Sequence, residues 1–162
     1  MPHFLGHVIV EQVAQFWVLQ SALSYVDSTV VHERIRIPAM LVTDFASIPR
    51  ALWAWAPPTE YTHAAASLLH DFIYECHRYD RRTADALFHE AMRATGTRRT
   101  KAWLMWGAVR AFGGSAYRSG PARQAEQREF WIKSRADQDR RLEDLLRQMP
   151  PPQSQGRGLE GR

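Results

Sequence analysis

The chain has 162 residues, 45% of them hydrophobic, which is enough to bury one core without requiring a second full domain. Its net charge is +4, but acidic and basic residues are mixed along the chain, which favours a solvated surface and argues against a specific nucleic-acid site. No apolar run approaches the roughly 20 residues of a transmembrane helix, and the single Cys76 excludes an intrachain disulfide and a multi-cysteine zinc site.

The N-terminal part of the chain predicts strands. We expect the first at residues 15–27 and the second at 29–37, where apolar and polar residues alternate with a period of two. Asp27–Ser28 suits a tight hairpin between them, and residues 41–42 predict a short third strand after Pro38. The expected result is one small antiparallel sheet with a solvent-facing side. The first ten residues lack the pattern of a secretory signal.

Helices are predicted for most of the remaining chain. Ser47 and Thr59 are N-cap candidates, and Gly96 and Gly113–Gly114 are stop signals. These signals predict helices at residues 47–55, 59–77, 81–94 and 100–112. The last of them is apolar almost all round, with Trp103 and Trp106 among its residues, so it is either buried or a half-buried interaction surface. Burial is our expectation, and we also expect Cys76 to be a packed thiol.

The composition divides the chain into three parts. Residues 1–116 form the expected core domain, of the α+β class, with a small antiparallel N-terminal sheet packed on a helical hairpin and further helices. Residues 117–149, rich in Gln, Glu, Arg and Asp from Pro121 onward, predict a long, exposed, charged helix. Residues 150–162 predict a disordered Pro/Gly-rich tail.

A group of polar residues in the helical hairpin is the candidate site. His70 and Asp71 lie among apolar residues of a predicted helix, where an unpaired carboxylate would cost several kcal/mol. Tyr74 lies one turn after His70 on the same helix face. The short connection makes the next helix antiparallel, which places Asp85 roughly 6 Å from His70 along the axis. His89 shares a face with Asp85.

Three interpretations of these residues remain open. In the first, His70 is a general base whose tautomer is fixed by Asp85 or Tyr74. In the second, His70, Asp71 and Asp85, with Asp44 or His89, bind a divalent metal ion that activates water. In the third, the residues form a polar network that fixes the helices and has no turnover. The spacing of His63 and His77 from His70 is too long for one shared ion, so we expect both at the surface or rim.

Three motifs in order carry a family resemblance. They are Thr43–Asp44–Phe45–Ala46–Ser47–Ile48–Pro49–Arg50, the segment from Ala65 to Tyr74, and Arg82–Thr83–Ala84–Asp85–Ala86–Leu87–Phe88. Together with the helix that ends at Gly113–Gly114, they resemble the domain of unknown function 1353 family over about residues 15–116. That family is found in tailed phages and prophages. The resemblance implies a phage- or prophage-encoded protein, located in the host cytoplasm during production or in the virion.

Its signature positions include Asp44, His70, Asp71, Tyr74 and Asp85, which supports a hydrolytic or metal-binding site with a divalent ion of unknown identity. The competing implication is a non-enzymatic tail or assembly component. Its contacts with other phage structural proteins would run through Trp103, Trp106 and the 121–149 helix.

Two further families are comparable. In secreted phospholipases A2, a His-Asp-x-x-Tyr helix faces an antiparallel helix that bears an Asp. That likeness implies His70 as the base for the attacking water, Asp71 as a calcium ligand, and Tyr74 with Asp85 as orienting partners. This chain lacks their disulfides, and its Asp44 loop lacks their calcium-loop glycines. The metal phosphohydrolases with a His-Asp motif are fully helical, which the predicted N-terminal strands do not fit.

Overall fold

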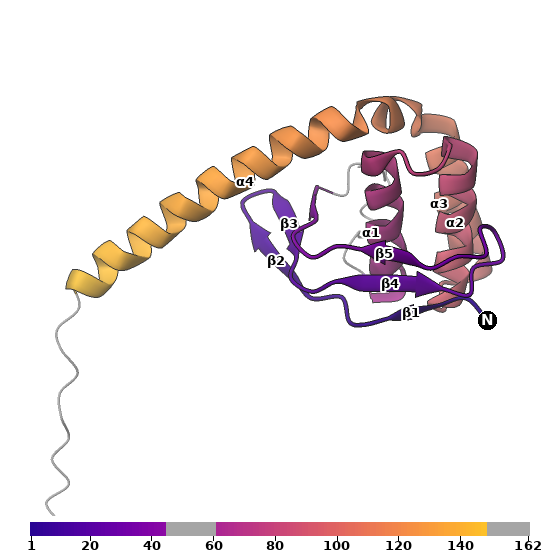
Figure 1. The fold of residues 1–162 in the computed structure, drawn as a ribbon, viewed down its shortest axis with the longest axis horizontal. Coiled ribbons are helices and arrows are strands. Elements are labelled where there is room, and N and C mark those ends of the chain that lie inside the picture. Colours follow the sequence, from indigo (N-terminus) through magenta and orange to yellow (C-terminus); the bar gives the residue numbers. More distant parts are fainter. Residues whose placement is uncertain (45–60, 149–162) are drawn as a thin grey trace, which may run out of the picture.

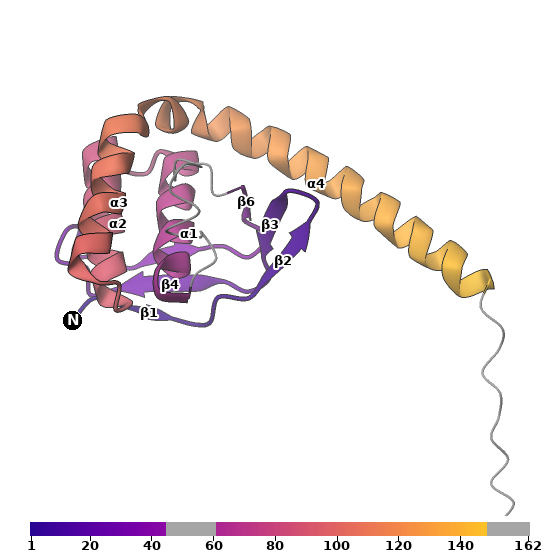
Figure 2. The same ribbon diagram turned by 180° about the vertical axis from the view of Figure 1, so that it is seen from behind.

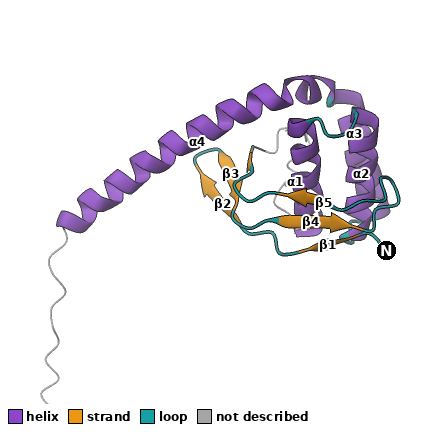
Figure 3. Ribbon diagram, viewed as in Figure 1, coloured by secondary structure: helices purple, strands orange, loops and turns teal. Residues whose placement is uncertain are grey.

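The computed structural model describes residues 1–44 and 61–148. It is an α+β fold in which two small antiparallel sheets lie against a group of helices (Figures 1 and 3). The elements are β1 (His3–Leu5), β2 (Val10–Val13), β3 (Phe16–Leu19), β4 (Leu23–Val26), β5 (Ile35–Ile37), β6 (Val42–Thr43), α1 (Tyr61–Cys76), α2 (Arg81–Ala94), α3 (Arg99–Phe112) and α4 (Gly114–Gln148). The predicted helix at 47–55, the N-cap at Thr59 and the predicted tail lie outside the described residues.

The strands form two three-stranded sheets instead of the single sheet that we expected. One sheet has the order β1-β4-β5 and the other β2-β3-β6. The predicted strand at 15–27 is therefore two strands, β3 and β4. At the end of β3 the amide of Leu19 donates to the carbonyl oxygen of Leu41, and the amide of Gln20 donates to that of Ile9. The chain then enters the other sheet. The predicted strand at 29–37 is shorter, with only β5 in the sheet, where Ile35 pairs with Tyr25.

The helices match the sequence pattern more closely. α2 has the predicted bounds, and its N-cap is Asp80, whose carboxylate accepts a 2.8 Å hydrogen bond from the amide of Thr83. α3 ends at Phe112, directly before its C-cap Gly113, as the glycine signal predicts. α4 begins directly afterwards at Gly114, so Pro121 lies inside this helix and does not start it.

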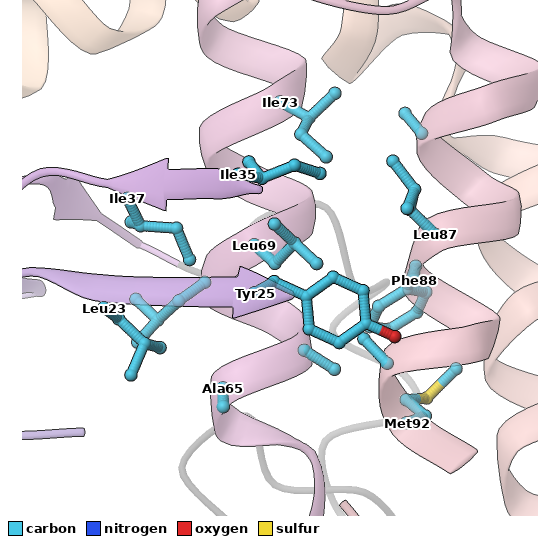
Figure 4. Close-up of a cluster of buried hydrophobic side chains, with 14 of the residues drawn as sticks. Leu23, Tyr25, Ile35, Ile37, Ala65, Leu69, Ile73, Leu87, Phe88 and Met92 are labelled. Atoms are coloured by element: carbon cyan, nitrogen blue, oxygen red, sulfur yellow. The ribbon is translucent and has the colours of Figure 1, made fainter. Parts of the chain in front are cut away.

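The hydrophobic core lies between the β1-β4-β5 sheet and the hairpin of α1 and α2. Figure 4 shows side chains of β4 and β5 pointing toward α1, while Leu87, Phe88 and Met92 approach from α2. Tyr25, Leu69 and Phe88 are each fully buried. Burial of such large apolar side chains contributes about 1.5–3 kcal/mol each, so this layer holds the α1–α2 hairpin in register.

The expectation that α3 is buried is wrong. Trp103, Leu104 and Phe112 are 61%, 51% and 72% exposed, and only Ala102, Met105 and Val109 of this helix are buried hydrophobic residues. α3 packs through one face against α2, and no other described element covers its outer face (Figure 2).

Two single-residue expectations also differ from the structure. Cys76 is exposed at the end of α1, where its thiol donates a 3.8 Å hydrogen bond to the carbonyl oxygen of Ile73. His63 is buried at the start of the same helix, although its spacing from His70 suggested a surface position. His77 is exposed, as expected.

The long helix α4 first crosses the body of the protein and then projects from it (Figure 1). Trp131 packs on a small apolar cluster of Phe16, Val18 and Val42, and Arg135 forms an ion pair with Glu11. From residue 136 to 148, every side chain that the structure describes is exposed, which agrees with the predicted charged helix. None of the helices in the described ranges has the length and apolar character needed to cross a membrane.

Candidate functional site

The α1–α2 hairpin brings three of the predicted site residues together. His70 Nε2 lies 3.0 Å from Asp85 Oδ1, and the Tyr74 hydroxyl donates a 2.6 Å hydrogen bond to the same oxygen. Because His70 and Tyr74 are one turn apart on α1, both reach the residue that α2 places opposite them. The three side chains are almost completely buried.

A fourth residue, Arg110 of α3, completes this cluster. Its guanidinium donates a 2.9 Å hydrogen bond to Asp85 Oδ2, so both carboxylate oxygens are occupied. Burial raises the pKa of Asp85, and the hydrogen bonds from His70, Tyr74 and Arg110 outweigh burial, so that the pKa lies below its usual value. Asp85 is therefore an anion held by three donors.

The orientation of the imidazole is fixed by packing as well as by Asp85. Its ring lies 4.0 Å from the ring of Tyr74 and 4.7 Å from that of Phe88, measured between centroids. With Nε2 bonded to a carboxylate, the neutral ring carries its proton on Nε2 and presents a lone pair at Nδ1. A carboxylate-oriented imidazole of this kind can take a proton from water.

Asp71 belongs to a different group of residues, although it follows His70 directly. Successive residues of a helix point about 100° apart, so Asp71 faces away from α2 and toward β6. Its Oδ2 accepts a 2.5 Å hydrogen bond from the hydroxyl of Thr43. Burial raises the pKa of Asp71 to about 6, against the effects of Thr43, His70 and Arg123. The predicted site is thus divided between two faces of α1.

Glu75 lies one turn after Asp71 and shares its buried face. Burial, together with the negative charge of Asp71, raises the pKa of Glu75 to about 9, although Arg123 of α4 opposes the shift. Within the described residues, Oδ1 of Asp71 and Oε2 of Glu75 have no hydrogen-bond partner, and the same holds for Ser67 Oγ and Gln127 Oε1.

The predicted metal set of Asp44, His70, Asp71 and Asp85 does not fit a single centre. Asp85 already accepts hydrogen bonds from three donors, and Asp44 acts electrostatically on Asp71, on the other face of α1. In residues 1–44 and 61–148, no group of three or more His, Cys, Asp or Glu side chains can hold a metal ion.

Helix geometry explains which of the predicted site residues come together. The pairing of His70, Tyr74 and Asp85 could be expected from spacing, whereas His89 lies apart from them and packs edge-on against Trp106 at 6.1 Å. Arg110 gave no signal, because its position depends on how α3 packs. Glu75 did have a signal that sequence reasoning missed, since it is an acidic residue at the apolar end of α1.

A model of the family described as "Protein of unknown function (DUF1353)" matches residues 17–109, which is more than half of the chain and includes His70, Tyr74 and Asp85. No curated protein and no solved structure matches this chain.

Proposed function

The chain belongs to this family of proteins of unknown function, DUF1353, and we propose that it is a phage- or prophage-encoded hydrolase in which His70 is the general base. The observation that carries the proposal is the 3.0 Å pairing of His70 Nε2 with Asp85, whose carboxylate is itself held by Tyr74 and Arg110. The phage origin rests on the family resemblance alone.

The proposed chemistry is attack of water on an acyl carbon. His70 Nδ1 takes a proton from the water as its oxygen bonds to the carbon, and the resulting imidazolium is stabilised by Asp85. The same proton is then given to the leaving group as its bond to the carbon breaks. Asp85, Tyr74 and Arg110 are positioning residues here, because they act on the imidazole and not on the substrate.

The second candidate is a non-enzymatic virion component in which these residues only stabilise the hairpin. Two observations favour it: the almost complete burial of His70, Tyr74 and Asp85, and the exposed apolar face of α3 with Trp103 and Leu104. A large exposed apolar face is typical of a surface that contacts another protein or a membrane. The two candidates differ in what replacement of His70 does to a folded protein.

The test is hydrolysis of acyl esters, phospholipid vesicles and purified peptidoglycan by the wild type, His70→Gln and His7→Gln. His7 is an exposed histidine and serves as the matched control. General-base catalysis contributes about 10²–10⁴-fold, so His70→Gln should lose at least about a hundredfold in rate while circular dichroism shows a folded chain.

Equal rates for the wild type and His70→Gln would overturn the proposal. A wild type inactive on all three substrates, with His70→Gln lowering only the melting temperature, would favour the virion component. In that case the protein should be found at a fixed copy number in purified particles.

A further inference from the structure

The outer face of α3 forms an apolar hollow together with α2. Trp103 and Leu104 lie in it, and their side chains are 61% and 51% exposed. The hollow has a volume of about 630 Å³ and is lined by His89, Arg93, Arg99, Thr100, Trp103 and Leu104. An exposed apolar surface with polar residues around it is typical of a site that contacts another protein. A segment that covers this hollow must therefore bring apolar side chains.

Positive charge surrounds the hollow. Residues 93–101, which connect α2 to α3, include four basic residues and no acidic one. Within the described residues, neither Arg93 nor Arg99 forms an ion pair. The guanidinium of Arg93 donates to the carbonyl oxygen of Thr97, which leaves its charge without an anionic partner. The hollow therefore fits a segment in which negative charge accompanies the apolar side chains.

The distal segment of α4, residues 136–148, has this combination. Leu142 and Leu145 are 55% and 60% exposed, and their spacing of three places them on the same side of the helix. Glu143 follows the first leucine and Asp144 precedes the second, so one carboxylate lies on each side of the apolar pair. Among the described residues, neither carboxylate has an ion-pair partner. The segment has four acidic and three basic residues, and its net charge is −1.

The hollow and the distal segment lie at opposite ends of the molecule. Figures 1 and 2 show the yellow C-terminal end of α4 projecting away from the body, whereas α3 lies on the far side of the body. The helix is continuous from Trp131, where it is anchored, to residue 148, which lies about 25 Å further along the axis. A continuous helix cannot turn back to α3 of its own chain. The distal segment can therefore reach an α3 hollow only in another molecule.

We propose that the distal segment of α4 in one copy of this chain binds the α3 hollow of a second copy. Leu142 and Leu145 enter the hollow beside Trp103 and Leu104, as the apolar side chains of a helix do when it binds in a groove. The acidic residues on either side of the pair face the arginines at the edge of the hollow.

The proposed contact joins two different surfaces, so each copy in a pair still has one hollow and one distal segment free. Such a contact assembles copies head to tail, into a closed ring or an open chain. The contact is small, and small interfaces are weak, so we expect assembly at about 10–100 μM protein. It does not involve His70. The inference therefore goes beyond the hydrolase proposal and can be tested separately from it.

The test is sedimentation velocity of the full chain at about 5–500 μM, in about 50 mM and about 500 mM NaCl. Leu104→Asp changes the hollow and Leu145→Asp changes the distal segment, because each places a carboxylate where the contact is apolar. Ile132→Asp is the matched control, since it makes the same kind of change at a 53% exposed position of α4 before the distal segment. Circular dichroism checks that each variant is folded.

We expect the average mass of the wild type to rise with concentration at low salt, and to rise less at high salt because the charges are screened. Leu104→Asp and Leu145→Asp should each remain monomers on their own. Mixed in equal amounts, they should form a species of two chains and nothing larger, because the mixture contains one intact hollow and one intact distal segment for each pair. Ile132→Asp and His70→Gln should assemble as the wild type does.

Three results would overturn the inference. The first is a wild type that stays monomeric at every concentration, which would leave the hollow to a different protein. The second is assembly of either leucine variant alone to the extent of the wild type, which would indicate contact between two like surfaces. The third is a mixture of the two leucine variants that stays monomeric.

Discussion

His77 and Tyr117 are joined by a 2.6 Å hydrogen bond between the imidazole Nε2 and the carbonyl oxygen of Tyr117. In a regular helix this carbonyl would accept from the amide four residues later, but that residue is Pro121, which has no N–H. The side chain of His77 at the end of α1 therefore supplies the donor that α4 lacks. The rings of His77 and Tyr117 also stack, with their centroids 4.4 Å apart.

Because the side chain of His77 replaces the N–H that Pro121 lacks, we expect the two residues to be energetically coupled. Replacing His77 by Asn keeps a residue that tolerates its left-handed backbone (φ 49°) but removes the donor to Tyr117. The free energy of unfolding should fall by about 1 kcal/mol in the wild type. It should fall less after Pro121→Ala, because Ala restores the helical N–H. Urea unfolding of the two single variants and the double variant measures the difference, and strict additivity would contradict the prediction.

The contact between α1 and α4 predicts an unusual effect of a glycine substitution. A Cβ atom on Gly120 would overlap the carbonyl oxygen of Tyr74 and lie 2.8 Å from its carbonyl carbon. Gly120→Ala should therefore destabilise the protein by about 1–3 kcal/mol, as overpacking usually does. Gly107→Ala is the control, since a Cβ there meets nothing within 4 Å. That change should stabilise α3 by up to about 1 kcal/mol. Thermal unfolding of the two variants checks this. A change of melting temperature in the same direction for both would contradict the prediction.

The hydrogen bonds to the Glu90 carboxylate should account for part of the stability that the protein loses in acid. Its carboxylate accepts hydrogen bonds from the hydroxyls of Tyr25, Ser28 and Thr29 and from the Thr29 amide, at 2.5–2.9 Å. Burial raises the pKa of Glu90, but these bonds outweigh it and hold the pKa below the usual 4.5. A carboxyl group with a lowered folded-state pKa stabilises the protein above its unfolded pKa, and this stability is lost as the pH falls through the folded value.

We therefore expect Glu90→Gln to lower the free energy of unfolding at pH 7 by about 1–3 kcal/mol. It should also make stability less dependent on pH below 4.5, the usual pKa of the group. Urea unfolding, measured at intervals of about one pH unit between pH 3 and 7, gives the free energy of unfolding and its dependence on pH. Glu143→Gln on the exposed part of α4 is the control and should leave the curve unchanged. A parallel shift of the Glu90→Gln curve at every pH would contradict the assigned titration.

The two faces of α3 predict opposite responses to truncation. Met105 is buried on the inner face, so Met105→Ala should cost about 2–5 kcal/mol. Trp103 on the outer face is 61% exposed, and Trp103→Ala should change the free energy of unfolding by less than about 0.5 kcal/mol. Chemical denaturation of both variants checks this. A large loss for Trp103→Ala would mean that the outer face is covered in the folded protein.

The residues of the helical hairpin could be predicted because their spacing is fixed by the helix itself. The bounds of α2 and the meeting of His70, Tyr74 and Asp85 follow from the short connection after α1 and from a rise of about 1.5 Å per residue. Contacts that depend on how separate elements pack, such as those of Arg110 with Asp85, gave no comparable signal.

The sheets were harder to predict for a different reason. β1 and β2 contain only three and four residues, too few to give a clear period. The apolar pattern of residues 15–27 continues across the point where the chain leaves one sheet and enters the other. The exposed α3 face was also unpredictable, because an apolar helix has the same sequence pattern whether other elements cover it or not.

The projecting part of α4 has a consequence for whatever attaches to it. A continuous helix is a rigid spacer, so the direction in which Leu142 and Leu145 point is set by the turn of the helix relative to the anchored segment around Trp131. Two residues inserted after residue 136 would rotate that apolar pair by about 200° while lengthening the helix by only about 3 Å. The binding of a partner there would thus depend strongly on the direction in which the apolar pair faces and very little on the length of the helix.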